Sequence, residues 1–173
     1  MQELERTFLM RAVPEGLREY SFKGMADIYI PKASRHPVVR LRKNGNKFCV
    51  TKKTVVKEGD ASHFLEQTID LTEEEFLELS NVGGKEVRKR RYLFDFDGRT
   101  AEIDVFEGAL KGLVLVDFEF ETKEEMDAFM IPNFCLAEVT QEEFTAGGML
   151  CGKSYEEIEP RLRGFGYSKL FVD

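Results

Sequence analysis

The chain begins MQELERTFLM, in which Glu3 and Glu5 are separated by a single apolar residue. Residues i and i+2 of a β-strand point to the same face, so these two carboxylates would stand side by side in an extended segment. Neighbouring like charges are destabilising on an ordinary strand face. Carboxylate oxygens are also the ligands that hard cations such as Mg²⁺ and Mn²⁺ prefer. The pair therefore indicates either a solvent-exposed face or a metal site.

The same spacing recurs in four more segments, and each of these doublets carries one sign of charge. Two doublets are basic and two are acidic: Arg40-Leu41-Arg42, Lys89-Arg90-Arg91, Glu102-Ile103-Asp104 and Asp117-Phe118-Glu119. Arginine offers forked donors to phosphate oxygens, and lysine offers a point charge. The residues between the charges are mostly apolar, and these apolar faces need to be covered. We therefore predict that the charged faces point into a closed or nearly closed barrel, where a polyphosphate chain with its metal ions would satisfy both signs. An ordinary β-sandwich with charged outer faces is the alternative.

Strand signals dominate the chain and predict the elements that must position these doublets. The expected strands cover residues 2–10, 20–30, 38–43, 47–56, 62–70, 86–96, 100–106 and 113–121. Asn44-Gly45 and Asp97-Gly98 are strong signals for two-residue hairpin loops. Such loops would place Arg42 opposite Lys47, and Arg91 opposite Asp104. Because no long βαβ alternation occurs, we expect an antiparallel sheet.

Short helices are expected between the later strands and after them. Thr72 and Thr122 are expected to cap helices over TEEEFLELS and TKEEMDAFM, and Thr140 to cap a weaker third. Residues 154–163 are a further candidate, which Pro160 would end or kink. These helices would lie outside the sheet and cover its apolar face. The expected fold class is α+β dominated by β structure.

Composition narrows the classes of function. The chain has 173 residues, which suits one domain, and its formal net charge of −7 does not favour binding to nucleic acid or to an anionic membrane. The basic run at residues 88–91 does not change this expectation, because strand alternation divides it between two faces. The three cysteines are widely spaced, without a zinc pattern or a disulfide framework, and no apolar run approaches a membrane span. We expect a cytoplasmic protein.

Taken in order, these segments resemble the CYTH superfamily, the triphosphate tunnel metalloenzymes. The family signature Glu-x-Glu-x-Lys stands here as Glu3-Leu4-Glu5-Arg6-Thr7, so that threonine replaces the lysine. The resemblance continues through Thr51-Lys52-Lys53, Glu66 and the four other doublets to about residue 120. It implies a single CYTH-like domain over residues 1–173, built as an eight-stranded antiparallel β-barrel around a hydrophilic tunnel. It also implies a metal-dependent hydrolase of triphosphate-containing substrates that uses Mg²⁺ or Mn²⁺.

The resemblance further implies roles for individual residues. The implied metal ligands are Glu3, Glu5, Asp104, Asp117 and Glu119, with Glu102 on the same wall. The implied substrate-binding residues are Arg40, Arg42, Lys53, Lys89 and Arg91. Lys53 and Glu66 are the expected catalytic residues, and Glu66 is a candidate to orient the attacking water. The expected partner is a triphosphate-containing small molecule, and a homodimer is left open. Two alternatives stay open: a class IV adenylate cyclase, and a catalytically weak triphosphate-binding module, because Thr7 removes a positive charge.

Overall fold

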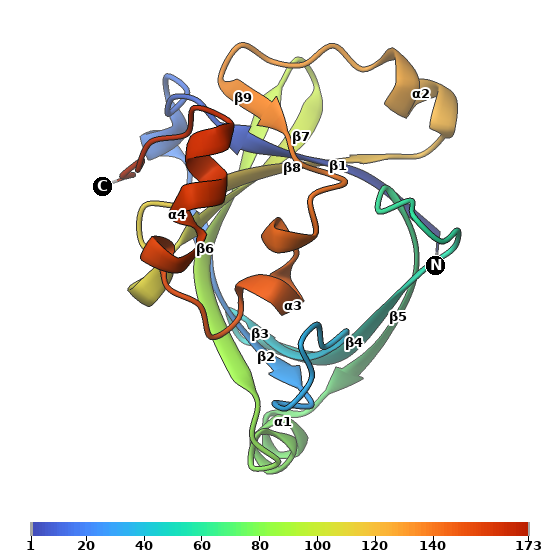
Figure 1. The fold of residues 1–173 in the computed structure, drawn as a ribbon. Coiled ribbons are helices and arrows are strands. Elements are labelled where there is room, and N and C mark those ends of the chain that lie inside the picture. The colour runs from blue at the N-terminus through green and yellow to red at the C-terminus, as the bar shows by residue number, and fades with distance from the viewer. Residues whose placement is uncertain (1, 173) are drawn as a thin grey trace.

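Eight antiparallel strands close into a barrel in the computed structural model, which describes residues 2–172 (Figure 1). The strands are β1 (Gln2–Met10), β2 (Phe22–Ile30), β3 (Val39–Asn44), β4 (Lys47–Val55), β5 (His63–Leu71), β6 (Lys85–Phe96), β7 (Arg99–Phe106) and β8 (Val114–Phe120). Their order around the sheet is β5-β4-β3-β2-β6-β7-β8-β1, and the pairing of β1 with β5 closes the ring. The barrel expected from the charge doublets is therefore confirmed.

A ninth strand, which the sequence pattern did not indicate, extends the wall beside β1. Strand β9 (Cys135–Glu138) pairs with the second half of β1, whereas β5 pairs with its first three residues. The long first strand thus has a different neighbour at each end of one edge. The strand signal of β9 was weak because the element has only four residues.

The predicted residue pairing is right for one of the two hairpins and wrong for the other. At the β6–β7 turn Asp97 (φ 51°) and Gly98 (φ 77°) are both left-handed, as a type I′ turn requires, and Arg91 lies opposite Asp104 as predicted. At the β3–β4 turn the predicted pairing is wrong, because Asn44 rather than Arg42 lies opposite Lys47. The slip amounts to two residues, and an even slip leaves every side chain on its predicted face.

Within residues 2–172 four helices accompany the strands: α1 (Glu73–Ser80), α2 (Lys123–Ala128), α3 (Gly147–Leu150) and α4 (Tyr155–Gly164), with 3₁₀ turns at Leu17–Glu19, Gly108–Leu110 and Glu143–Thr145. Thr72 and Thr122 cap α1 and α2 as expected, and each accepts a hydrogen bond from the third helical N–H. Helix α4 continues past Pro160, so of the two outcomes expected for this residue, an end or a kink, the end is wrong. No helix within residues 2–172 is long and apolar enough to cross a membrane.

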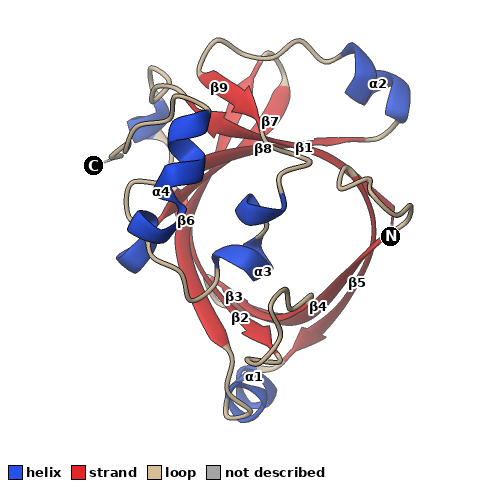
Figure 2. Cartoon of the chain, viewed as in Figure 1, coloured by secondary structure: helices blue, strands red, loops and turns tan. Residues whose placement is uncertain are grey.

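The segment after Thr140 differs from the predicted capped helix. The Thr140 hydroxyl accepts a hydrogen bond from the Thr7 backbone N–H instead of capping a helix. The chain then makes a 3₁₀ turn and the one-turn helix α3. Viewed along the barrel, α3 projects into the ring of strands (Figure 2). Contact there is close, because a Cβ added to Gly147 would lie 2.1 Å from the Tyr29 hydroxyl oxygen.

Apolar residues form two cores, one on each side of the barrel wall. The outer core joins the outward-facing Phe8, Ile103 and Phe118 to Met126 of α2 and to Phe134. The inner core fills one end of the barrel, where Leu9 and Leu115 meet side chains of α3 and α4. Helix α2 thus covers an outer face as expected, while α3 and its flanking turns close one end of the barrel. The polar interior of the barrel begins next to this apolar end.

Candidate active site

A cavity of about 880 Å³ occupies the interior of the barrel. It is lined by all of the site residues predicted from the sequence, together with Glu102, namely Glu3, Glu5, Arg40, Arg42, Lys53, Glu66, Lys89, Arg91, Glu102, Asp104, Asp117 and Glu119. These residues come from seven strands, from β1 and from β3 to β8. The predicted convergence on one interior space is confirmed, and the chemical role of each residue stays a prediction.

Arg91 and Asp104 form the most extensively bonded pair in the cavity. The Arg91 Nε and Nη2 atoms donate to the two carboxylate oxygens of Asp104 at 2.7 Å and 2.6 Å. Arg91 also pairs with Glu102, and Lys89 pairs with Asp104. Asp104 is 1% exposed, and burial by itself would raise its pKa, but Arg91 and Lys89 hold that pKa well below its usual range. Asp104 therefore stays ionised in the folded protein.

Asp27 on β2 is a site residue that sequence analysis missed. It lies directly opposite Arg42, whose Nε and Nη2 atoms donate to its two carboxylate oxygens, both at 2.6 Å. Asp27 is 2% exposed; burial opposes its ionisation, but the bonds from Arg42 hold its pKa below the ordinary value. Asp27 belongs to no charge doublet, and for that reason the pattern did not reveal it. A lone acid at an alternating position beside a basic strand was the available signal.

Arg40 forms a longer ion pair than the shortest one formed by each of the other predicted substrate-binding residues. It forms an ion pair with Glu66, at 3.7 Å between Nη2 and Oε2, which is longer than a hydrogen bond. Its Nε–H is buried and has no hydrogen-bond partner within residues 2–172. A buried donor without an acceptor costs free energy that a bound oxygen would recover. Arg40 therefore offers a donor to an anion in the cavity.

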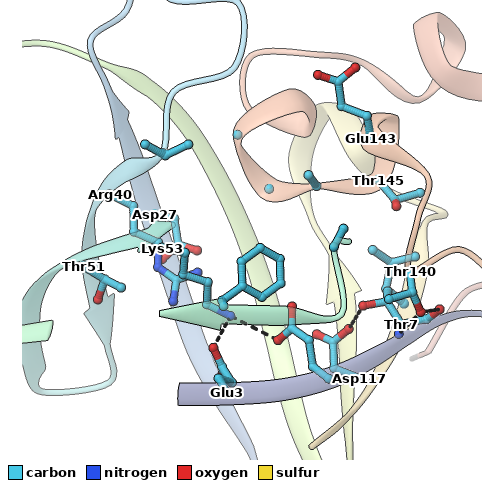
Figure 3. A pocket seen from close by; sticks show the side chains of 18 of the residues that line it. Glu3, Thr7, Asp27, Arg40, Thr51, Lys53, Asp117, Thr140, Glu143 and Thr145 are labelled. Atoms are coloured by element: carbon cyan, nitrogen blue, oxygen red, sulfur yellow. Dashed lines mark hydrogen bonds and ion pairs between the residues drawn. The ribbon is translucent and has the colours of Figure 1, made fainter. Parts of the chain in front are cut away.

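Lys53 bridges the basic and acidic sides of the cavity (Figure 3). Its Nζ atom lies 2.7 Å from a Glu3 oxygen, 3.1 Å from a Glu5 oxygen and 3.7 Å from a Glu66 oxygen. Burial opposes the charge on Lys53, but the two β1 glutamates raise its pKa, so the amine is charged. The expected catalytic residues Lys53 and Glu66 are thus brought together.

We call Glu3, Glu5, Asp117 and Glu119 the acidic wall. Glu5 and Glu119 lie directly opposite each other on β1 and β8. Burial raises the pKa of Glu5, and the charges of Asp117 and Glu3 raise it further. Burial, Glu102 and Glu3 raise the pKa of Glu119 to about 7, and its carboxylate makes no hydrogen bond or ion pair within residues 2–172. Negative charge on this wall is incompletely compensated.

Oxygen-rich acidic surroundings of this kind fit a hard divalent cation, which would relieve the repulsion between the carboxylates. In the part of the chain from residue 2 to residue 172, no group of three or more Asp, Glu, His or Cys side chains is already arranged to hold a metal ion. Lys53 stands between Glu3 and Glu5, and Arg91 is bonded to Asp104 and Asp117. Metal binding would therefore require some of these ion pairs to rearrange.

Thr7 lies on the acidic wall, as its spacing from Glu5 predicts. Its hydroxyl donates to a carboxylate oxygen of Asp117 at 2.7 Å, and Figure 3 shows the two side chains facing each other. The position contributes one neutral donor in place of a charge. Lys153, in the segment before α4, pairs with Glu157 at 3.1 Å and does not line the cavity.

Known proteins share both the sequence and the fold. The chain is 33% identical over 144 residues to the inorganic triphosphatase of Nitrosomonas europaea, an alignment that covers 83% of this chain and 92% of that protein. A crystal structure of an inorganic triphosphatase superposes with a TM-score of 0.62 at 29% identity, covering 86% of this chain and 93% of the other. A Pyrococcus horikoshii protein shares the fold, with a TM-score of 0.51 at 18% identity over 96% of this chain and 91% of the other. No family model matches the chain.

Proposed function

This chain belongs to the CYTH superfamily, as does the inorganic triphosphatase to which it is related over most of its length. We propose that this chain is a metal-dependent hydrolase of triphosphate-containing substrates. Inorganic tripolyphosphate and nucleoside or other organic triphosphates are the candidate substrates. One observation carries the proposal: cations of β3, β4 and β6 and carboxylates of β7, β8 and β1 line different sides of one cavity inside the barrel. A polyanion with its metal ions matches both sides.

Five cations would hold the phosphate chain: Arg40, Arg42, Lys53, Lys89 and Arg91. The buried Nε–H of Arg40 has no hydrogen-bond acceptor within residues 2–172, so it would donate to a phosphate oxygen. Arg42 and Arg91 present planar guanidinium groups, which bind phosphate oxygens in a fixed geometry. Charge in the transition state of phosphoryl transfer spreads over the phosphoryl oxygens, so fixed donors around them lower the barrier.

The acidic wall would hold Mg²⁺ or Mn²⁺ through Glu3, Glu5, Asp117 and Glu119. Asp104 is a further predicted ligand, although both of its oxygens are already bonded to cations. A bound divalent ion would neutralise charge on the phosphate oxygens and act as a Lewis acid. The directly opposed carboxylates of Glu5 and Glu119, whose pKa values are both raised, support this assignment.

Hydrolysis would proceed by attack of water on the terminal phosphorus, with the bridging oxygen leaving on the remaining diphosphate. We assign the orientation of that water to Glu66, which lies at the junction of Arg40 and Lys53. Burial opposes ionisation of Glu66, but Thr68 and Lys53 lower its pKa, so it accepts hydrogen bonds as a carboxylate. In this scheme the protein supplies position and charge rather than a covalent nucleophile.

Phosphate release from tripolyphosphate, pyrophosphate, ATP and thiamine triphosphate, each with Mg²⁺ or Mn²⁺, tests the proposal. We expect hydrolysis of at least one triphosphate, and none without metal.

Arg40→Gln should weaken substrate binding on the order of tenfold or more, because a charged hydrogen bond contributes about 1.5–3 kcal/mol. Arg88→Gln is the matched control, since Arg88 is an arginine of β6 whose side chain is 66% exposed. Binding without turnover of any triphosphate would favour the binding module.

A further inference from the structure

Two aspartates hold two arginines of the cavity in the same way. Asp27 binds Arg42, and Asp104 binds Arg91, in each case through the arginine Nε and Nη2 atoms and both carboxylate oxygens. The four distances lie between 2.6 Å and 2.7 Å. Each pair is also a direct cross-strand pair, between β2 and β3 and between β6 and β7. The arrangement therefore occurs twice in the barrel wall.

This geometry fixes which edge of each guanidinium is available. Nε and Nη2 form one edge of the planar group, so the Nη1 atom remains on the opposite side. Arg42 Nη1 makes no hydrogen bond within residues 2–172, and Arg42 lines the cavity. Arg91 Nη1 bonds to Glu102, another cavity residue. Each aspartate is at least 98% buried, so each guanidinium group is held by a carboxylate that is shielded from water.

We propose that Asp27 and Asp104 are positioning residues, which fix the guanidinium planes of Arg42 and Arg91 toward the substrate. This inference rests on the proposed triphosphatase function and assigns Asp27 a part in it. The surroundings of Asp27 support positioning rather than metal binding: the charged groups that act on it are Arg42, Arg40 and Lys89. For Asp104, positioning competes with the sequence prediction of a metal ligand, and the experiment separates the two.

A positioning role predicts a specific kinetic signature. Asp27→Asn removes a negative charge from a basic part of the cavity, so it should not weaken the initial binding of a polyanion. It also frees the Arg42 side chain from one orientation, and misplacement of a catalytic group lowers the rate of the chemical step. We therefore expect kcat to fall on the order of tenfold to hundredfold, with KM lowered or changed by less than about threefold.

The experiment compares wild type, Asp27→Asn, Asp27→Glu, Arg42→Lys and the Asp27→Asn/Arg42→Lys double variant on the best triphosphate of the substrate panel. Asp27→Glu keeps the carboxylate and should recover part of kcat. The double variant should be no slower than the slower single variant, because Asp27 acts only through Arg42.

Mn²⁺ affinity, measured by calorimetry without substrate, should be unchanged in Asp27→Asn and in Asp104→Asn. Unchanged kcat in Asp27→Asn, or additive losses in the double variant, would overturn the role of Asp27. A tenfold loss of Mn²⁺ affinity in Asp104→Asn would overturn that of Asp104.

Breaking a buried ion pair can unfold a protein, so a measurement on the wild type is also needed. NMR of the arginine Nε–H groups tests whether the pairs persist when the substrate site is filled. We expect the Arg42 and Arg91 Nε–H signals to remain protected from exchange when tripolyphosphate is added. Loss of protection would show that the aspartates release the arginines and would overturn the proposal. If wild type neither binds nor hydrolyses any triphosphate, the proposed function itself fails, a result distinct from either of these.

Discussion

One cavity holds two sets of carboxylates whose pKa values shift in opposite directions: Asp27 and Asp104, which hold arginines, have lowered pKa values, and Glu5 and Glu119 of the acidic wall have raised ones. Burial disfavours ionisation in both sets. Asp27 and Asp104 overcome it because a guanidinium bonds to both of their oxygens. Glu119 has no such partner; burial and the acids Glu102 and Glu3 outweigh the effect of Lys53, so its pKa rises to about 7. Partner geometry, rather than depth, decides which carboxylates stay ionised.

This difference separates carboxylates that are paired within the protein from carboxylates that mainly face other acids. The arginine-holding aspartates are satisfied by the protein alone. Glu119 of the acidic wall has no such partner, and a divalent cation would offset the repulsion between it and the neighbouring carboxylates. Variants that remove a partner from the first group, or a charge from the second, should therefore have opposite effects on stability.

The largest effect is expected for Arg91→Gln, which would turn Asp104 into a buried acid that lacks its main partner. Removing one member of a buried ion pair typically costs about 3–5 kcal/mol. We expect the unfolding free energy of the metal-free protein to fall by about that amount, and turnover to fall at least about a hundredfold. Denaturant unfolding and phosphate release measure the two. Arg88→Gln is the control, and a loss of less than about 1 kcal/mol would show that Lys89 alone can hold Asp104.

Glu5→Gln and Glu119→Gln should act in the opposite sense on stability. Each removes one of two directly opposed acids, so the metal-free protein should be as stable as wild type or more stable. Affinity for Mn²⁺ should fall sharply, on the order of tenfold or more, because a charged ligand becomes a neutral one. Calorimetric titration of the metal-free protein gives the affinity. Glu121→Gln, just beyond β8 at an exposed position, is the matched control. Equal metal affinity in all four proteins would contradict the ligand assignment.

Thr7→Lys should supply the cation that the family signature places at this position. The new amine would lie beside Asp117 and on the face of Glu5, where it would reduce the excess of negative charge. Tripolyphosphate should bind about tenfold more tightly, because charge-assisted hydrogen bonds are roughly twice as strong as neutral ones. The affinities are compared at one fixed salt and metal concentration, with turnover recorded alongside and Thr7→Val as the uncharged control. Unchanged or weaker binding would mean that the lysine pairs with Asp117 instead of the phosphates.

The smallest effect concerns the pH dependence of stability. The folded pKa of Glu119 is raised to about 7 from an ordinary value near 4.5, so the folded state binds more protons than the unfolded state between these values. Stability of the metal-free protein should therefore fall as pH rises from about 4.5 to about 7. Thermal unfolding across this range tests it, and Glu119→Gln should flatten the slope. A wild-type slope equal to that of the variant would show that Glu119 does not titrate in this window.

The alternation of charged and apolar residues was sufficient to predict which side chains face inward, even where a pairing was wrong. Arg42 lies opposite Cys49 rather than Lys47, yet it lines the cavity as expected. A strand repeats every two residues, so a slip of two leaves the face unchanged. The turn at Asp97-Gly98 was predicted with its pairing, because the local preference for left-handed residues specifies that loop.

The sequence by itself thus determined the barrel strands, the inward charge doublets and the family to which they belong. Only the tertiary structure decided the partner of each charge. Asp27 and Arg42 are separated by 15 positions, and Lys53 and Glu5 by 48, and no local rule connects such residues. Closure of the ring through β1 and β5 brings Lys53 to the β1 glutamates, and the β2–β3 register places Asp27 against Arg42. These are long-range contacts, and because electrostatic interactions depend on distance and burial, the ionisation of each carboxylate followed from the fold rather than from its place in the chain.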